Sequence, residues 1–222
     1  MGSAEDGRAT RWAGHRARRR AEIVAAALAA VNEHGPSVST EQIAERAGIP
    51  RPRLYRHFTD AEDLHNAVAQ RIAEELVAEL APALSGRGGG TPRDIIGRIV
   101  DTFVTWMTEN TSLYRYVVAR GADGLTADAR TTISGMLRDL LAGYLAVLAL
   151  DTRRADPLAF GLVGMVESAT QRWLVAPGSL GRDGLVHQLT IWIWGLLDTM
   201  LRASGVVIEP DLPLPPLPDT AP

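Results

Sequence analysis

The chain has 222 residues, of which 46% are hydrophobic and 22% charged, with 23 basic and 26 acidic side chains and no cysteine. This composition is typical of a globular protein, and a chain of this length can bury a core without disulfides. The lack of cysteine excludes disulfide scaffolds, thiolate metal sites and cysteine nucleophiles. No apolar run reaches the roughly 18 to 20 residues of a membrane span, and the N-terminus lacks the apolar core of a secretory signal. We therefore expect a cytoplasmic protein with no membrane partner.

Charge is distributed unevenly along the chain. Residues 8–59 contain ten arginines against four acidic residues, whereas residues 61–222 contain 13 arginines against 19 acidic residues. The first part thus carries a local charge of +6, which favours a polyanionic partner such as double-stranded DNA.

Periodicity and capping residues predict an all-α fold with about nine helices. Residues 1–15 lack periodicity and predict a flexible N-terminal arm, after which apolar residues at three- and four-residue steps predict a helix from Arg16 to His34. Capping residues, first-turn prolines and glycine stops predict eight more helices. These cover residues 40–47, 52–58, 61–80, 92–109, 112–120, 126–150, 156–175 and 182–203. No run alternates with the period of two that a strand requires.

The chain ends in a Pro-rich tail, residues 206–222, which contains six prolines and few polar side chains. This composition favours extended chain over a packed element, and we expect a disordered end. The alternative is that Leu212, Leu214 and Leu217 pack on the surface of the domain.

The stretch from Thr40 to Phe58 predicts a helix-turn-helix. Ala44 is small where the second helix would cross the first, Gly48 stands in the turn, and apolar anchors flank it at Ile43, Ile49, Leu54 and Phe58. A helical wheel places Arg53, Tyr55 and Arg56 opposite the anchors, with Arg51 at the leading end. Arginine can bond guanine or phosphate in a major groove, and tyrosine can reach a phosphate oxygen. The pattern indicates sequence-specific DNA binding; the alternative is a solvated charged face on an ordinary helical hairpin.

Residues Arg16 to Leu64 resemble the DNA-binding region of the TetR/AcrR family of bacterial repressors. The family pattern has a helix, a glycine, Thr-x-x-Ile-Ala, Ala-Gly-Val/Ile and Leu-Tyr-x-His-Phe, and this sequence contains each element. The resemblance implies a homodimer with a helix-turn-helix domain over residues 16–60, its motif at 39–58, and a helical ligand-binding and dimerisation domain over residues 61–205.

The resemblance also implies roles for single residues. Thr40 would hold a phosphate, Pro52 would touch a thymine methyl group, and Tyr55 and His57 would contact the DNA backbone. Arg51, Arg53 and Arg56 would divide between bases and phosphates. The sequence departs from the family pattern at two positions, because Ala61 stands where a phosphate-binding lysine is usual and Glu41 where a basic or polar residue is common.

The last two long helices, residues 156–175 and 182–203, are apolar on more than one side. Gly161, Gly164 and Gly195 destabilise a helix by about 1 kcal/mol each relative to alanine unless another backbone approaches closely. We therefore expect both helices to form an intermolecular four-helix bundle in a homodimer, as the family does. The alternative is that they pack into a core within one chain.

Aromatic and modestly polar residues in the second domain could line an apolar cavity for an effector. Our candidates for ligand contact are Trp106, Met107, Tyr114, Glu167 and Gln171. The histidines lack metal-ligand spacing, and no phosphate loop, nucleophile elbow or zinc-protease motif occurs, so we expect no metal, no cofactor and no enzyme activity.

Together these features predict a homodimeric repressor that a small apolar ligand releases from a palindromic operator. The alternatives are a DNA-anchored protein-interaction module and an activator without small-molecule induction.

Overall fold

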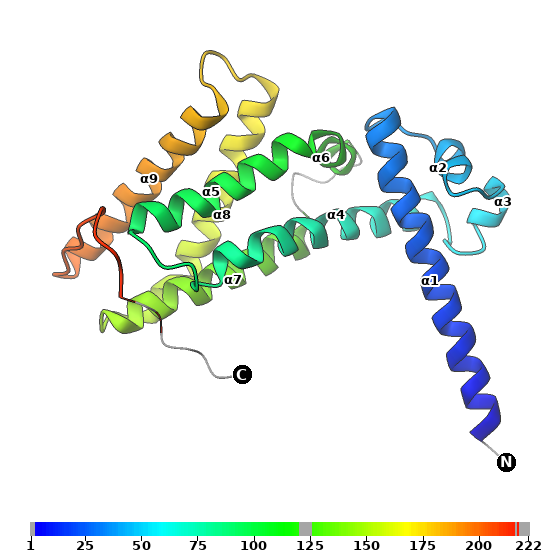
Figure 1. The fold of residues 1–222 in the computed structure, drawn as a ribbon, viewed down its shortest axis with the longest axis horizontal. Helices are drawn as coiled ribbons and strands as arrows, with labels where there is room; N and C mark the ends of the chain where they lie inside the picture. The colour runs from blue at the N-terminus through cyan, green and yellow to red at the C-terminus, as the bar shows by residue number, and fades with distance from the viewer. Residues whose placement is uncertain (1–2, 120–125, 216, 218–222) are drawn as a thin grey trace. The chain divides into compact units, whose positions relative to one another are not determined.

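The computed structural model describes residues 3–119, 126–215 and 217, and within these residues the fold is all-α (Figure 1). The helices are α1 (Ser3–His34), α2 (Thr40–Arg46), α3 (Arg51–Leu54), α4 (Ala61–Leu84), α5 (Pro92–Glu109), α6 (Thr111–Val118), α7 (Ala127–Val147), α8 (Ala155–Val175) and α9 (Arg182–Ala203), with a short 3₁₀ helix at Thr152–Arg154 before α8. The predicted fold class is therefore confirmed.

The chain forms two compact units. Unit 1 contains residues 1–73 and 111–123, and unit 2 contains residues 74–110 and 124–222. Helix α4 contributes its first turns to unit 1 and its last turns to unit 2. The boundary predicted at residues 60 and 61 falls in unit 1, at the start of α4.

Unit 1 is built on α1, which packs against α2 and α6. Its core includes the apolar stripe of α1 and the inward faces of α2, α3 and α4; Ile23, Val31, Ile43, Leu54, Phe58, Leu64 and Val68 are almost fully buried. Burying a side chain of this size contributes roughly 1.5 to 3 kcal/mol. The anchors predicted for the helix-turn-helix are thus core residues.

Unit 2 consists mainly of two helix pairs, α5 with α9 and α7 with α8 (Figure 1). Helix α5 begins at a capping box in which Thr91 and Asp94 each bond the other's backbone N–H, followed by Pro92 in the first turn. Arg182, at the start of α9, pairs with Asp101 and bonds Thr105 on α5. These contacts fix where α9 begins against α5.

The structure differs from the predicted helices at four ends. Helix α7, predicted to reach Leu150, ends at Val147, because the chain turns through Ala149 at φ +55°. Helix α1 begins at Ser3, so residues 3–15, predicted as a flexible arm, are helical; alanine and arginine are frequent there and extend a helix at little cost. Helix α3 ends at Leu54. From there to Phe58 the chain forms turns with backbone hydrogen bonds over three residues, such as that from the His57 N–H to the Leu54 carbonyl. Helix α4 passes Pro82, which lies within its last turn. The predicted end of α6 at Arg120 lies outside the described residues.

The described part of the Pro-rich tail packs on unit 2, so the expectation of a disordered end is wrong for residues 206–215 and 217. Leu214 and Leu217 are half-buried, whereas Leu212 is 61% exposed. The tail packs because its leucines find apolar partners and its backbone bonds the loop before α5. Residues 216 and 218–222 lie outside the described residues.

No helix in the described ranges has both the length and the apolar character that crossing a bilayer requires.

Candidate functional site

The helix-turn-helix is shaped by local capping. Ser39 is the N-cap of α2: its hydroxyl accepts from the backbone N–H of Gln42, and the Gln42 side chain accepts from the N–H of Ser39. Gly48 adopts φ +65°, a left-handed conformation that favours glycine, and lets the Ile49 N–H reach the Ala44 carbonyl at 3.0 Å. Pro52 stands in the first turn of α3, where its missing N–H costs nothing. The sequence therefore dictates both the turn and the start of α3.

The predicted DNA-binding residues form one accessible surface on unit 1. Arg51, Pro52, Arg53 and Arg56 are exposed, and Thr40, Tyr55 and His57 are half-buried. Leu54 and Phe58 point into the core, as the helical wheel predicts. The surface presents three guanidinium groups, none of which is paired with a buried carboxylate, and the phenol of Tyr55. Such groups can contact phosphates and base edges.

Arg51 is held by two neighbours. Its guanidinium lies 3.0 Å from the Glu41 carboxylate, 3.5 Å from the Tyr55 hydroxyl and 5.7 Å above the centre of the Tyr55 ring. The Glu41 carboxylate accepts a hydrogen bond from the Glu41 backbone N–H. This bond, together with the charge of Arg51, lowers the pKa of Glu41, so the carboxylate is ionised at neutral pH. Glu41, the first departure from the family pattern, thus ties Arg51 to the start of α2.

Two other predicted residues sit in different surroundings. The hydroxyl of Thr40 donates to the Glu41 carboxylate at 3.2 Å. Partial burial, with Arg19 and Arg53 nearby, lowers the pKa of His57, which favours a neutral ring at pH 7. Ala61, the second departure, is the first residue of α4 and has no side chain that could reach a phosphate.

A clamp of Arg20 and Asp63 fixes the end of the motif to α1 and α4. Arg20 donates to both Asp63 oxygens, at 2.5 and 3.1 Å, and to the His57 carbonyl at 2.8 Å, while its guanidinium lies 4.2 Å above the Phe58 ring. The Thr59 N–H also donates to Asp63 at 2.9 Å. Sequence reasoning missed this clamp because its partners are 43 positions apart and no local pattern joins them.

The clamp predicts a specific pH dependence. Bonds from Arg20, and from the Thr59 N–H, lower the pKa of Asp63 to about 2. A lowered folded-state pKa stabilises the fold above the unfolded pKa of about 3.9, and this contribution disappears as the pH falls toward 2. We expect Asp63→Asn to lower the free energy of unfolding by about 1 kcal/mol at pH 7, because water screens a partly exposed pair.

Urea unfolding at pH 7 and at pH 3 checks this expectation. The difference between the parent and Asp63→Asn should shrink at pH 3. An equal difference at both values would mean that the Asp63 charge does not stabilise unit 1.

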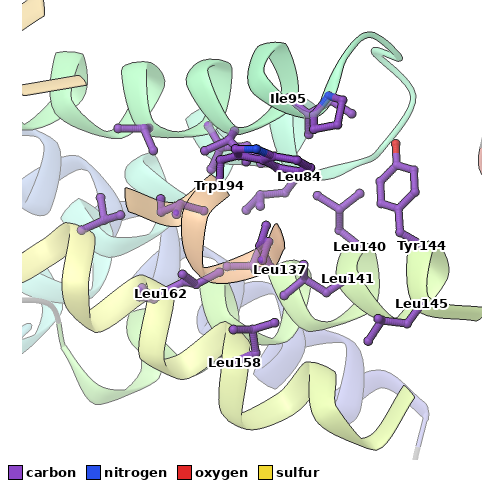
Figure 2. A pocket seen from close by; sticks show the side chains of 18 of the residues that line it. Leu84, Ile95, Leu137, Leu140, Leu141, Tyr144, Leu145, Leu158, Leu162 and Trp194 are labelled. Atoms are coloured by element: carbon purple, nitrogen blue, oxygen red, sulfur yellow. The ribbon is translucent and has the colours of Figure 1, made fainter. Parts of the chain in front are cut away.

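Unit 2 contains an apolar cavity of about 150 Å³ (Figure 2). Side chains from the end of α4, from α5, α7, α8 and α9, and from the tail line it, including Leu84, Leu137, Leu141, Leu158, Trp194 and Leu214. Tyr144 carries the one hydroxyl among the lining residues, and Figure 2 shows this hydroxyl pointing away from the leucines. Burial raises the pKa of Tyr144, so the phenol stays protonated and can donate a hydrogen bond.

The predicted ligand-contact residues do not line this cavity. Trp106 and Met107 are buried elsewhere in unit 2, and Tyr114 is buried in unit 1. Glu167 is almost fully buried, 3.0 Å from Arg130 of α7 and 3.2 Å from the Gln171 amide. Ligand contact by these five residues stays a prediction. The residues that do line the cavity follow the same apolar pattern as the core, so the sequence held no signal for them.

Within the described ranges, no three histidine or acidic side chains gather closely enough to hold a metal ion.

Comparison with known proteins bears on both units. The sequence pattern of "Bacterial regulatory proteins, tetR family" matches residues 23–68, which include α2 and α3. The HTH-type transcriptional regulator Rv0472c of Mycobacterium tuberculosis is 31% identical over 204 residues, covering 90% of this chain and 86% of that protein. The chain belongs to the TetR family. It is therefore a transcriptional regulator with a DNA-binding helix-turn-helix.

Two other similar proteins are informative. The HTH-type transcriptional activator FasR of Mycolicibacterium smegmatis is 26% identical over 179 residues, covering 78% of this chain and 80% of that protein. The structure of the transcriptional regulator FadR from Bacillus subtilis in complex with stearoyl-CoA has a TM-score of 0.55 and 14% identity, covering 78% of this chain and 96% of that one. At this identity the second comparison shows a shared fold.

Proposed function

We propose that this protein is a ligand-responsive repressor that binds a palindromic operator as a homodimer. The exposed surface of Arg51, Arg53, Tyr55 and Arg56 carries the proposal. In a helix-turn-helix dimer, two such surfaces lie one helical turn of DNA apart, roughly 34 to 36 Å, and each enters a major groove. The exposed Arg16 and Arg18 add positive charge on α1 that can neutralise phosphates.

The proposed dimer uses α8 and α9. Phe160 on α8 and Ile191, Trp192 and Leu196 on α9 are exposed although they are large and apolar. A Cβ added at Gly161, Gly164 or Gly195 would meet no atom within 4 Å, so these positions leave room for a partner backbone. An apolar helical face of this kind supports association with a second copy.

The proposed effector site is the cavity of unit 2. Its lining is almost entirely hydrocarbon, which suits an aliphatic chain, with Tyr144 available for a polar group. FadR, a regulator of the same fold, was solved in complex with stearoyl-CoA, so a long-chain acyl compound is our first candidate effector.

Helix α4 supplies a route from effector to DNA. Its Leu80 and Leu84 line the cavity, and its Asp63 holds Arg20 and the loop after α3. An effector that prefers one position of this helix would shift the dimer toward a half-site spacing that the operator does not match. The coupling between the two sites in such systems is typically about 1 to 3 kcal/mol.

The DNA surface is tested by Arg56→Ala and Tyr55→Ala. Each should weaken operator binding by roughly 1 to 3 kcal/mol, because each removes a contact to DNA without touching the core. Titration of labelled operator measures the loss, and an unchanged melting temperature shows that folding is intact. Arg138→Ala, an exposed arginine on α7, is the matched control and should bind like the parent. Parental affinity in both test variants would show that this surface does not read DNA.

Activation is the second candidate function, because the relative FasR is an activator. The sign of regulation depends on where the operator lies relative to the promoter. A reporter gene behind the native promoter distinguishes the two: deletion of the regulator raises expression if it represses and lowers expression if it activates.

A further inference from the structure

The end of the chain forms a strap across unit 2, which we define as residues 206–215 and Leu217. The strap leaves α9 at Gly205, where φ is +78°. Two backbone bonds attach it to the segment around the start of α5: the Leu214 N–H donates to the Gly90 carbonyl at 3.0 Å, and the Arg93 N–H donates to the Pro210 carbonyl at 3.5 Å. Pro213 and Pro215 have no N–H, so Leu214 is the one backbone donor in residues 213–215.

Gly86 and Gly143 leave the space that the side chain of Leu217, the last described residue of the strap, occupies. A Cβ added at Gly86 would lie 2.7 Å from Cδ1 of Leu217, and a Cβ at Gly143 would lie 3.2 Å from Cδ2. Any larger side chain at either position would push Leu217 away. The strap is therefore held on unit 2 by the close packing of Leu217 at its end and by backbone hydrogen bonds along its length.

The strap is also a wall of the cavity. Ile208 and Leu214 line the cavity together with helical side chains such as Leu140 and Leu201. The other lining side chains belong to helices, except Leu148, which caps the end of α7 and whose N–H donates to the Tyr144 carbonyl. The strap, in contrast, has no internal helical bonds between Val206 and Glu209 or from Pro213 onward. It is the wall that can move at the lowest cost.

In this conformation the cavity is too small for the proposed effector. An apolar cavity of about 150 Å³ holds a molecule the size of benzene, whereas sites for larger ligands measure roughly 300 to 1,000 Å³. A long acyl chain can therefore enter only if one wall of the cavity moves.

Charge at the strap matches an anionic amphiphile. Asp211 lies 3.5 Å from the Arg93 guanidinium, so the strap places a carboxylate on α5 and, three residues later, an aliphatic side chain in the cavity. Arg98 donates to the Gly89 carbonyl at 2.7 Å in the same loop region and acts electrostatically on Tyr144. An acyl compound with an anionic head group has the same two features: a negative charge that Arg93 can pair with, and an aliphatic chain that the cavity can hold.

We propose that the strap is a gate for the effector cavity, and that an anionic single-chain amphiphile enters by replacing Asp211 at Arg93 and Leu214 in the cavity. This inference rests on the proposed effector role of the cavity. It adds a means of regulation: the strap competes with the ligand for one site, so its hold on unit 2 sets both the affinity and the rate of entry.

A reversible lock tests the gate. The chain has no cysteine, and a Cβ built at Gly143 would lie 3.8 Å from Cγ of Leu217, so Gly143→Cys with Leu217→Cys places two thiols close enough for a disulfide within one chain. In the oxidised protein, palmitate should associate at least about tenfold more slowly than in the reduced protein, while benzene, which fits the closed cavity, should bind equally well to both. Palmitoyl-CoA in parallel distinguishes a free carboxylate from a thioester as the head group.

A pair of variants in the strap tests the same gate without a disulfide. Leu214→Ala removes the side chain that lines the cavity and should speed palmitate association by about tenfold. Leu212→Ala, on the exposed side of the same strap, should leave the rate unchanged. Melting temperatures check that both variants fold.

Equal rates of palmitate uptake in oxidised and reduced protein would overturn the gate. So would the failure of both acyl compounds to bind the reduced protein, since the proposal requires such a ligand. Either result leaves the DNA-binding proposal standing, because the operator titrations with Arg56→Ala judge that function without any effector.

Discussion

Replacing Arg130 with alanine should lower the free energy of unfolding by about 3 kcal/mol or more. Arg130 on α7 holds Glu167 on α8 through two bonds, at 3.0 and 3.1 Å, and the Glu167 side chain is 3% exposed. Removing the arginine takes away the ion-pair partner of a buried carboxylate, and breaking a buried pair from one side typically costs 3 to 5 kcal/mol.

Urea unfolding at one fixed protein concentration measures this loss, since dimer formation would otherwise change the apparent stability. Arg138→Ala is the control, because Arg138 lies on the same helix and pairs with Asp139 at the surface; it should change stability by less than about 1 kcal/mol. Adding Glu167→Gln to Arg130→Ala should recover part of the loss by removing the buried negative charge. A loss in Arg130→Ala no larger than in Arg138→Ala would mean that the buried pair does not hold α7 to α8.

Replacing Trp192 with glutamate should convert the dimer to monomers and abolish tight operator binding. Trp192 is 51% exposed on α9 and lies beside the exposed Ile191 and Leu196. Removing a central aromatic residue from an interface typically weakens binding by at least about 2 kcal/mol. In a two-fold symmetric dimer, each substitution occurs twice in the interface. We therefore expect dimerisation to weaken by at least about 4 kcal/mol.

Analytical ultracentrifugation and operator titration measure the two effects. Val147→Glu is the matched control, because it also adds a charge at an exposed apolar position, but on α7. It should remain dimeric and bind DNA. A dimeric Trp192→Glu protein would show that α9 does not form the interface.

Helix ends could be predicted where the signal is local. Thr91 with Asp94 marks the start of α5, and Gly48 marks the turn before α3, because caps and left-handed glycines act over three or four residues. The start of α1 could not be predicted, since apolar periodicity stops near Arg16 while the helix continues to Ser3. The packing of the strap could only be given as an alternative, because proline content does not indicate which leucines find apolar partners.

The same distinction holds for the two sites. One helical wheel predicted that Arg53 and Arg56 are exposed, although α3 ends at Leu54 and Tyr55 is half-buried. Contact of these three residues with DNA stays a prediction. The Arg20–Asp63 clamp and the Arg130–Glu167 pair join residues far apart in the chain, and only the folded structure brings them together. The cavity depends on where leucines of α7 leave space against α5 and α9, which no periodicity encodes.

Selection of bound sequences from random double-stranded DNA tests the central claim most directly. If two α3 surfaces read one duplex in a symmetric dimer, the selected sites will contain two inverted half-sites whose centres lie about 10 to 10.5 base pairs, or a multiple of this, apart. Arg56→Ala should select a relaxed half-site at the position that the arginine contacts. Enrichment of no sequence at all, or of a single half-site that Arg56→Ala leaves unchanged, would contradict the account.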